Sequence, residues 1–350
     1  MNDFYDAYTD KRTAVPTTRD TFSRLGLSIV LLILGTTVTE YAIIFLFLLA
    51  FPAAASAWWA NWVVSFVPLY GLGLPMMYLV LQKLPPAPHN AACDNGFISY
   101  EKPAFTAKNW FTVLFMGFGC MYIGSIVGNW CMTLLSVVTG YSYTSALDTM
   151  VDTSPLWMTL LGACVIAPLG EEFIFRKLFI DRARRFGDAP AILLSGLLFG
   201  LFHGNLFQFF YAAMLGILLA YVYTRTNNLW LCVGMHAAIN LMGGVVIPAL
   251  GELVPTDPAA ELTTLQALIS LVIAVWAYGT IIAAIVMFIK RNKWRVLSPC
   301  PDRRSTRTVM GDAIAVPAML AAVILYVFDI FVELALPVIQ MYLLKLQQIA

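Results

Sequence analysis

The sequence predicts an all-α fold, a polytopic bundle of about eight or nine transmembrane helices. Apolar residues make up 60% of the 350 positions, charged residues make up only 12%, and the mean hydropathy is +0.78. Soluble domains of this size do not need so high a fraction of apolar residues. In addition, apolar runs that are long enough to cross a hydrocarbon core of about 30 Å recur along the whole chain.

Nine apolar runs are expected to be membrane spans. They lie near residues 25–51, 60–81, 110–138, 155–175, 189–207, 208–224, 229–250, 265–289 and 313–336. The first run is longer than the core of a cleaved signal peptide, so we expect it to remain as an anchor. Asp329, Glu333 and Pro337 interrupt the last run, whose second half is expected either to span or to lie at the interface.

The basic residues indicate the orientation of these spans. With the N-terminus in the cytoplasm, 20 of the 21 Lys and Arg residues fall on the cytoplasmic side, and only Lys345 falls outside. The opposite segments 141–154 and 251–262 carry acidic residues and no basic residue. We therefore expect an integral protein of a bacterial plasma membrane with a cytoplasmic N-terminus.

The six cysteines give no sign of a disulfide or a zinc site. Cys120, Cys131, Cys164 and Cys232 lie in predicted spans, where a thiol behaves as a small apolar group. Cys93 and Cys300 lie in predicted cytoplasmic loops, where thiols stay reduced.

Two adjacent carboxylates, Glu171 and Glu172, lie near the cytoplasmic end of the fourth span. Adjacent residues of a helix point about 100° apart, so the two are not expected to share one task. Glu172 and Arg176 have the i, i+4 spacing of an ion pair, which leaves Glu171 free to face a cavity. The alternative reading of this segment is an interfacial salt-bridge cluster of Glu171, Glu172 and Arg176 at a helix end, beside Lys177 and Arg182.

The fifth span contains His203 and a stripe of glycines at Gly196, Gly200 and Gly204. Glycines four residues apart allow another helix backbone to approach closely. Glu171 and His203 each lie 16 residues from Gly187, the predicted turn between the fourth and fifth spans. An antiparallel hairpin at this turn would bring both side chains to the same depth.

The seventh span places His236 and Asn240 on one helix face, because they are four residues apart. His236 lies only about 12 Å from the inner turn of its span, which is shallower than His203. We expect helix tilt to absorb this difference in depth, or the pocket to be elongated.

A carboxylate with imidazole and amide groups in a low-dielectric pocket suits the hydrolysis of an amide bond. The carboxylate can accept a proton from water, and imidazole or amide donors can stabilise a tetrahedral oxyanion. Glu171, His203 and His236 could also bind Zn²⁺, since two histidines and one glutamate form a known catalytic set. The chain lacks the sharper metal signature H-E-x-x-H, so zinc and a metal-free, glutamate-activated water both stay open.

Three motifs in this order resemble the CPBP family of membrane proteins. They are Glu171-Glu172-x-x-x-Arg176, Phe199-x-x-x-His203 and His236-x-x-x-Asn240. The family comprises type II CAAX prenyl endopeptidases and bacterial proteins of bacteriocin processing or self-immunity, and the resemblance covers roughly residues 155–245.

The resemblance implies a role for each matching residue. Glu171 and His203 would activate water, and His236 and Asn240 would form the oxyanion hole. Glu172 and Arg176 would support the site, and Phe199 would shape the pocket. Membrane lipid and a membrane-associated peptide or protein, either prenylated or bearing a leader, are the expected partners, and nucleic acid is not.

We expect the chain to divide into three regions. Residues 1–154 hold the first three spans, residues 155–250 form the catalytic core, and residues 251–350 hold the C-terminal spans. A non-catalytic immunity or binding protein is the alternative function. A proton-coupled transporter is a further alternative, which draws on Glu40 deep in the first span but lacks an internal repeat.

Overall fold

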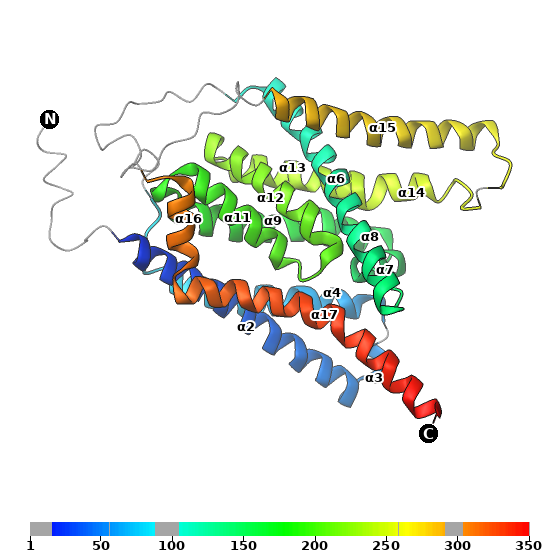
Figure 1. Ribbon diagram of the computed structural model, residues 1–350, viewed down its shortest axis with the longest axis horizontal. Coiled ribbons are helices and arrows are strands. Elements are labelled where there is room, and N and C mark those ends of the chain that lie inside the picture. The colour runs from blue at the N-terminus through cyan, green and yellow to red at the C-terminus, as the bar shows by residue number, and fades with distance from the viewer. Residues whose placement is uncertain (1–15, 56, 88–104, 258, 291–303, 350) are drawn as a thin grey trace, which may run out of the picture.

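The computed structural model confirms a polytopic helical bundle. It describes residues 16–55, 57–87, 105–257, 259–290 and 304–349 (Figure 1). In this described part of the chain, eight helices are long and apolar enough to cross a membrane, and one shorter apolar helix covers Asp188–Phe202. Cys93, Cys300 and the loops that contain them lie outside the described residues, whereas the other four cysteines are free thiols.

The helices follow the predicted order of spans. Their bounds are α2 (Thr18–Ala50), α3 (Pro52–Ala55), α4 (Trp58–Pro68), α5 (Leu74–Leu81), α6 (Ala107–Thr139), α7 (Ala146–Thr153), α8 (Leu156–Leu161), α9 (Ala167–Glu172), α10 (Asp181–Ala183), α11 (Asp188–Phe202), α12 (Leu206–Thr226), α13 (Leu229–Leu241), α14 (Ile247–Gly251), α15 (Thr264–Ile289), α16 (Thr306–Ile314) and α17 (Pro317–Ile349). Short π- or 3₁₀-helical segments join some of them into continuous spans: η1 (Leu69–Gly73), η2 (Gly162–Ile166), η3 (Phe173–Ile180), η4 (Arg184–Phe186) and η5 (Met242–Val246).

Capping residues set several helix ends. Thr17 forms a capping box with Asp20 at the start of α2, since its hydroxyl accepts from the Asp20 amide at 3.1 Å. Asn205 caps α12 by accepting from the amide of Gln208 at 2.9 Å. Gly140 ends α6 with φ of +69°, a left-handed conformation that glycine adopts without strain.

Three spans contain a five-residue π-helical segment that ends two residues before a proline. The segments η1, η2 and η5 precede Pro75, Pro168 and Pro248 respectively. Proline has no N–H, and its ring clashes with the carbonyl four residues earlier, which is the third residue of each segment. The wider π-helical turn relieves this clash without breaking the span.

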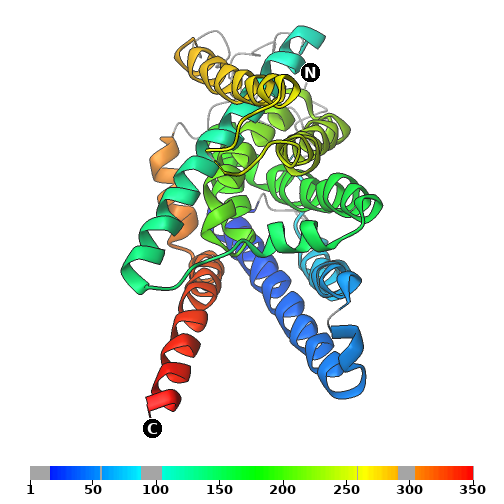
Figure 2. The same ribbon diagram turned by 90° about the vertical axis from the view of Figure 1, so that its right-hand side faces the viewer.

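The core of the bundle is formed by α9, α11, α12 and α13. Helix α12 packs against α11, α13 and α6, and α13 packs against α9. Helices α6 and α15 lie along one side of this core, and α2 and α17 lie along the other (Figure 1). The backbone of Met319 lies directly against Gly26, and from there α2 and α17 diverge toward their C-terminal ends (Figure 2).

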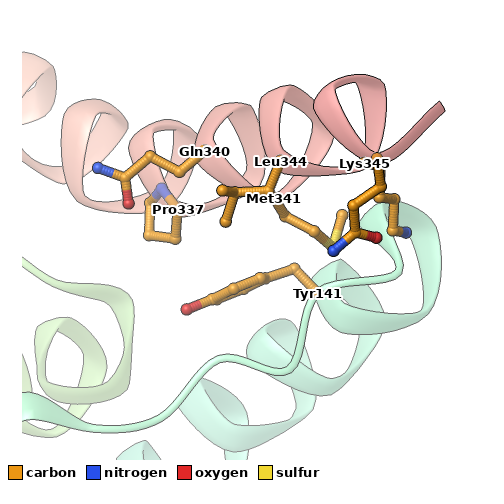
Figure 3. Close-up of a pocket in the computed structure, with 7 residues that line it drawn as sticks. Tyr141, Pro337, Gln340, Met341, Leu344 and Lys345 are labelled. Carbon is orange, nitrogen blue, oxygen red and sulfur yellow. The ribbon is translucent and has the colours of Figure 1, made fainter. Parts of the chain in front are cut away.

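Helix α17 is continuous through Pro337, so the last apolar run is a single helix. Just before this proline it packs against the connection between α6 and α7, where the Tyr143 hydroxyl donates to the carbonyl of Leu334 at 3.0 Å. Tyr141 faces the same helix across a shallow hollow of about 330 Å³ (Figure 3). The end of α17 is thus held by aromatic contacts.

Candidate active site

The adjacent carboxylates of the fourth span have separate partners, as predicted. Arg176 pairs with both oxygens of Glu172, at 2.8 Å from Nε and 3.2 Å from Nη2. Its third nitrogen donates to the Ser195 hydroxyl at 3.0 Å, and this hydroxyl donates to the carbonyl of Phe175 at 3.2 Å. Glu172 and Arg176 are both 0% exposed, so this is a fully buried, bidentate pair rather than an interfacial cluster.

Glu172 also orients His236, a contact that the sequence did not predict. The Nδ1 atom of His236 lies 3.0 Å from Oε1 of Glu172, while its Nε2 lies 3.8 Å from Oε2 of Glu171. An ionised carboxylate only accepts hydrogen bonds, so Nδ1 carries the proton and Nε2 points toward Glu171. Helix α13 packs directly on α9 at this position.

Glu171 has an oxygen without a partner. Its Oε2 atom is buried and makes no hydrogen bond within the described part of the chain. The helix is held in place just before it, where the Tyr70 hydroxyl donates to the carbonyl of Ile166 at 3.2 Å. A Cβ atom at Gly170 would lie 2.2 Å from that hydroxyl, so only glycine allows this contact. Such a buried, unpaired oxygen is suited to accept a proton.

His203 lies at the end of its helix rather than inside the predicted span 189–207. Helix α11 ends at Phe202, and His203 is its C-cap. The backbone amide of His203 bonds to Gly200, so the carbonyl of Phe199 is left for the side chain, whose Nδ1 lies 2.8 Å away. This contact places the proton on Nδ1 and leaves Nε2 as the free nitrogen.

The predicted hairpin between the fourth and fifth spans is confirmed. Gly187 forms the turn with φ of +104°. Glu171 and His236 both lie within electrostatic range of His203. No direct hydrogen bond between Glu171 and His203 occurs among the described residues. The two side chains come from the two arms of the hairpin and interact electrostatically without a hydrogen bond in the described chain.

The glycine stripe of α11 is confirmed at two of its three positions. A Cβ atom at Gly196 would lie 2.7 Å from the backbone nitrogen of Ile217, and one at Gly200 would lie 2.8 Å from the carbonyl of Phe209. Helix α12 thus approaches this face closely. Gly204 is different, because with φ of +67° it forms the turn after the helix rather than part of the contact.

Phe199 forms the wall between the two histidines. Its ring centroid lies 5.0 Å from that of His203 and 5.7 Å from that of His236, in edge-to-face geometry. The guanidinium of Arg176 lies over the same ring at 5.1 Å. Phe199 is 1% exposed, so it fixes the spacing of both imidazoles.

Asn240 donates to a backbone carbonyl, which was not predicted. Its Nδ2 lies 2.8 Å from the carbonyl oxygen of Ala163 in η2. In a π-helix this carbonyl would accept from residue 168, which is a proline without an N–H, and the amide of Ala167 bonds to Gly162. One N–H of Asn240 replaces the missing donor, and the second remains available to the site.

The donor set of the predicted zinc site does not assemble in the described chain. No three His, Cys, Asp or Glu side chains among the described residues lie in an arrangement that could hold a metal ion. The Nδ1 atoms of His203 and His236 are already engaged, and their Nε2 atoms are the available ligands. We therefore derive no step of the reaction through a metal.

Ser195 and Tyr70 are supporting residues that sequence reasoning missed. A serine within an apolar helix is a weak signal, although Ser195 is 0% exposed and joins Arg176 to the backbone. Tyr70 comes from a span distant in sequence, and its contact with Gly170 depends on how the helices are rotated.

The fold and this cluster define a polytopic membrane protein whose helices α9, α11 and α13 bring two carboxylates and two imidazoles together, with Glu172 and His236 buried. Residues 153–242 match the family described as type II CAAX prenyl endopeptidase Rce1-like. This matching segment includes every residue of the cluster described above, from Glu171 to Asn240.

Three curated proteins are similar at low identity. "Putative membrane peptidase YdiL" of Bacillus subtilis (strain 168) is 26% identical over 98 residues, which cover 28% of this chain and 39% of that protein. "UPF0177 protein YxdF" and "UPF0177 protein YbdI" of Lactococcus lactis subsp. lactis (strain IL1403) are 24% and 28% identical over 151 and 164 residues. These matches cover 41% and 43% of this chain, and 84% and 83% of the relatives. No solved structure matches.

Proposed function

We propose that the protein is an intramembrane endopeptidase that hydrolyses a peptide bond of a membrane-associated peptide or protein. The observation that carries this proposal is the unpaired carboxylate oxygen of Glu171, which lies 3.8 Å from His236 and within electrostatic range of His203. A buried, unpaired carboxylate is costly, and such residues in membrane helices mark functional sites.

Glu171 acts as the general base in this proposal. It takes a proton from a water molecule as the water oxygen bonds to the carbonyl carbon of the peptide. Nε2 of His203 accepts the second hydrogen bond of that water and orients it. The proton held by Glu171 then passes to the leaving nitrogen as the C–N bond breaks, which restores the carboxylate.

The tetrahedral oxyanion is stabilised by donors on α13. The second N–H of Asn240 is one donor. His236 is the other, through Nε2–H, and for this its ring must carry both protons. Glu172 holds Nδ1 of this ring, and Glu171 lies on the opposite side of it. Preorganised donors of this kind are worth about 10²–10³ in rate each.

The proposed mechanism needs no metal ion. We expect dialysis against a chelator to leave the cleavage rate unchanged, and metal analysis of the active protein to find less than one equivalent of zinc. A rate that falls on chelation and returns with added Zn²⁺ would instead assign Glu171, His203 and His236 as metal ligands.

A bacterial plasma membrane with the N-terminus in the cytoplasm is the proposed location. The distribution of Lys and Arg supports this orientation, and the relatives from two bacteria support the source. Glu171 lies on the span that leads into the basic segment Arg182–Arg185, so the bond is cleaved nearer the cytoplasmic face.

Reconstituted protein tests the proposal directly. The purified chain is incubated in liposomes with a library of prenylated and leader-bearing membrane peptides, and the products are identified by mass spectrometry. We expect fragments with the wild type and a loss of at least about 10²-fold with Glu171→Gln and with His203→Ala. Exposed Glu252→Gln is the control. Equal turnover by all these proteins would refute the peptidase assignment.

A further inference from the structure

A second group of carboxylates lies on α2 and α17 and takes no part in the mechanism above. It consists of Glu40, Asp329 and Glu333, which we call the acidic face. Asp329 and Glu333 are one turn apart on α17, and Glu40 on α2 lies within electrostatic range of Asp329. In the described part of the chain, none of the three forms an ion pair, and Oε2 of Glu333 is buried without a hydrogen bond.

The acidic face continues into a buried tyrosine. Tyr326 precedes Asp329 by three residues and Glu333 by seven, so the three share one side of α17. Tyr326 is 4% exposed, yet its hydroxyl has no hydrogen-bond partner among the described residues and lies within electrostatic range of Asp329. A buried hydroxyl without a partner is a cost that a bound donor would remove.

This group borders the candidate active site. The Asp329 carboxylate reaches the turn after α11, where its Oδ2 lies 2.8 Å from the position that a Cβ atom of Gly204 would occupy. Gly204 follows His203 directly, and the ring of Tyr326 contacts that of Phe202 at 6.5 Å. Along both helices the acidic face follows the contact of Gly26 with Met319 in sequence. Beyond this contact α2 and α17 diverge (Figure 2).

The chemistry of the group selects an organic cation. Three carboxylates that form no ion pair within the described chain, and that lie in membrane helices, favour a positively charged ligand. No three acidic side chains of the described chain are placed to hold a metal ion, and Asp329 and Glu333 are separated by about 6 Å along their helix. An ammonium or guanidinium group at the end of a long side chain can bond carboxylates spaced in this way, and it can also donate to the Tyr326 hydroxyl.

We propose that the acidic face binds a lysine or arginine side chain of the substrate, close to the bond that is cleaved. This inference rests on the proposed peptidase function and adds a substrate class to it: membrane peptides with a basic residue near the scissile bond.

Binding and cleavage are measured on one set of probes. Each probe is a labelled peptide with an apolar segment of about 20 residues. A single residue of the peptide is replaced by Lys, Gln or Glu, and the set contains these three probes for each position tested along the peptide. Binding to full-length Glu171→Gln protein in nanodiscs is measured by fluorescence anisotropy. At a few of these positions we expect the Lys probe to bind at least about tenfold more tightly than the Gln probe. A charge-assisted hydrogen bond contributes enough binding free energy for this difference in Kd.

Substitutions assign this preference to the acidic face. Asp329→Asn with Glu333→Gln removes the preference for Lys, Asp329→Lys reverses it in favour of Glu, and the exposed Asp152→Asn on α7 leaves it unchanged. Unaltered thermal unfolding of each variant shows that the fold is kept. Equal Kd values for the three probes at every position would overturn the inference, as would a Lys preference that survives the double substitution.

The cleavage rates of the wild type separate the two proposals. If probes are cleaved but Lys, Gln and Glu bind equally, the peptidase function stands and the basic-residue site is overturned. If no probe is cleaved but the Lys preference depends on Asp329 and Glu333, the peptidase function fails and the cation site stands.

Discussion

Glu172 on α9 and Glu333 on α17 are both acids inside membrane helices, but their surroundings differ. Glu172 is 0% exposed, and both of its oxygens are engaged by Arg176, with His236 on one of them. Glu333 has a buried oxygen with no hydrogen bond in the described chain. Glu171 lies next to Glu172 in sequence, yet it resembles Glu333 in having an unpaired oxygen.

The difference separates carboxylates that hold the structure from carboxylates that are available to a ligand. A buried ion pair with complete hydrogen bonding orients its neighbours, here the imidazole of His236. An unpaired acid adds nothing to the packing, so its cost is offset only by function. This contrast predicts that substitutions in the paired group lower stability. Substitutions of the unpaired acids should instead lower activity or ligand binding and leave stability nearly unchanged.

The largest effect on stability is expected from Arg176→Ala. The substitution leaves the buried charge of Glu172 without its partner, which should lower the free energy of unfolding by about 3–5 kcal/mol. Thermal or denaturant unfolding of the purified protein in detergent measures this loss. Arg176→Met combined with Glu172→Gln is the matched control, because it removes both charges together and should be clearly less destabilising. An Arg176→Ala protein as stable as the wild type would contradict the structural role of this pair.

A smaller loss is expected from Asn240→Leu. The carbonyl of Ala163 then has no donor, because Pro168 cannot replace it, and an unsatisfied buried carbonyl costs about 1–3 kcal/mol. The same unfolding measurement applies, with the exposed Asn129→Leu on α6 as the control. If both variants unfold at the same temperature or denaturant concentration, the side-chain amide of Asn240 contributes nothing to the stability of the fold.

Glu333→Gln should have the smallest effect on stability. The substitution removes an unpaired charge and breaks no contact, so the free energy of unfolding should stay within about 0.5 kcal/mol of the wild type or rise. Unfolding in the same detergent, beside Arg176→Ala, makes the comparison direct. A loss as large as that of Arg176→Ala would show that Glu333 has a structural partner.

Local spacing predicted much of this arrangement. The span order, the turn at Gly187 and the pairing of Glu172 with Arg176 depend on residues that are close in sequence, and the structure confirms them. The contact between Glu172 and His236 could not be predicted in this way, because it depends on how α9 and α13 are rotated against each other.

Irregular backbone explains the remaining differences. The π-helical segments before prolines change which side chains share a face, and η2 exposes the carbonyl that Asn240 binds. His203 was predicted inside a span because apolar residues continue past it. The chain instead ends the helix at Phe202 and turns at Gly204, where a left-handed conformation suits glycine.

The cleavage rate of Glu171→Gln, measured beside its thermal unfolding, tests the central claim most directly. The account predicts that this protein unfolds at the temperature of the wild type but cleaves a membrane peptide at least about 10²-fold more slowly. Glu172→Gln, one residue away, should be destabilised because its pair with Arg176 is lost. A Glu171→Gln protein that cleaves at the wild-type rate would contradict the assignment of Glu171 as the base.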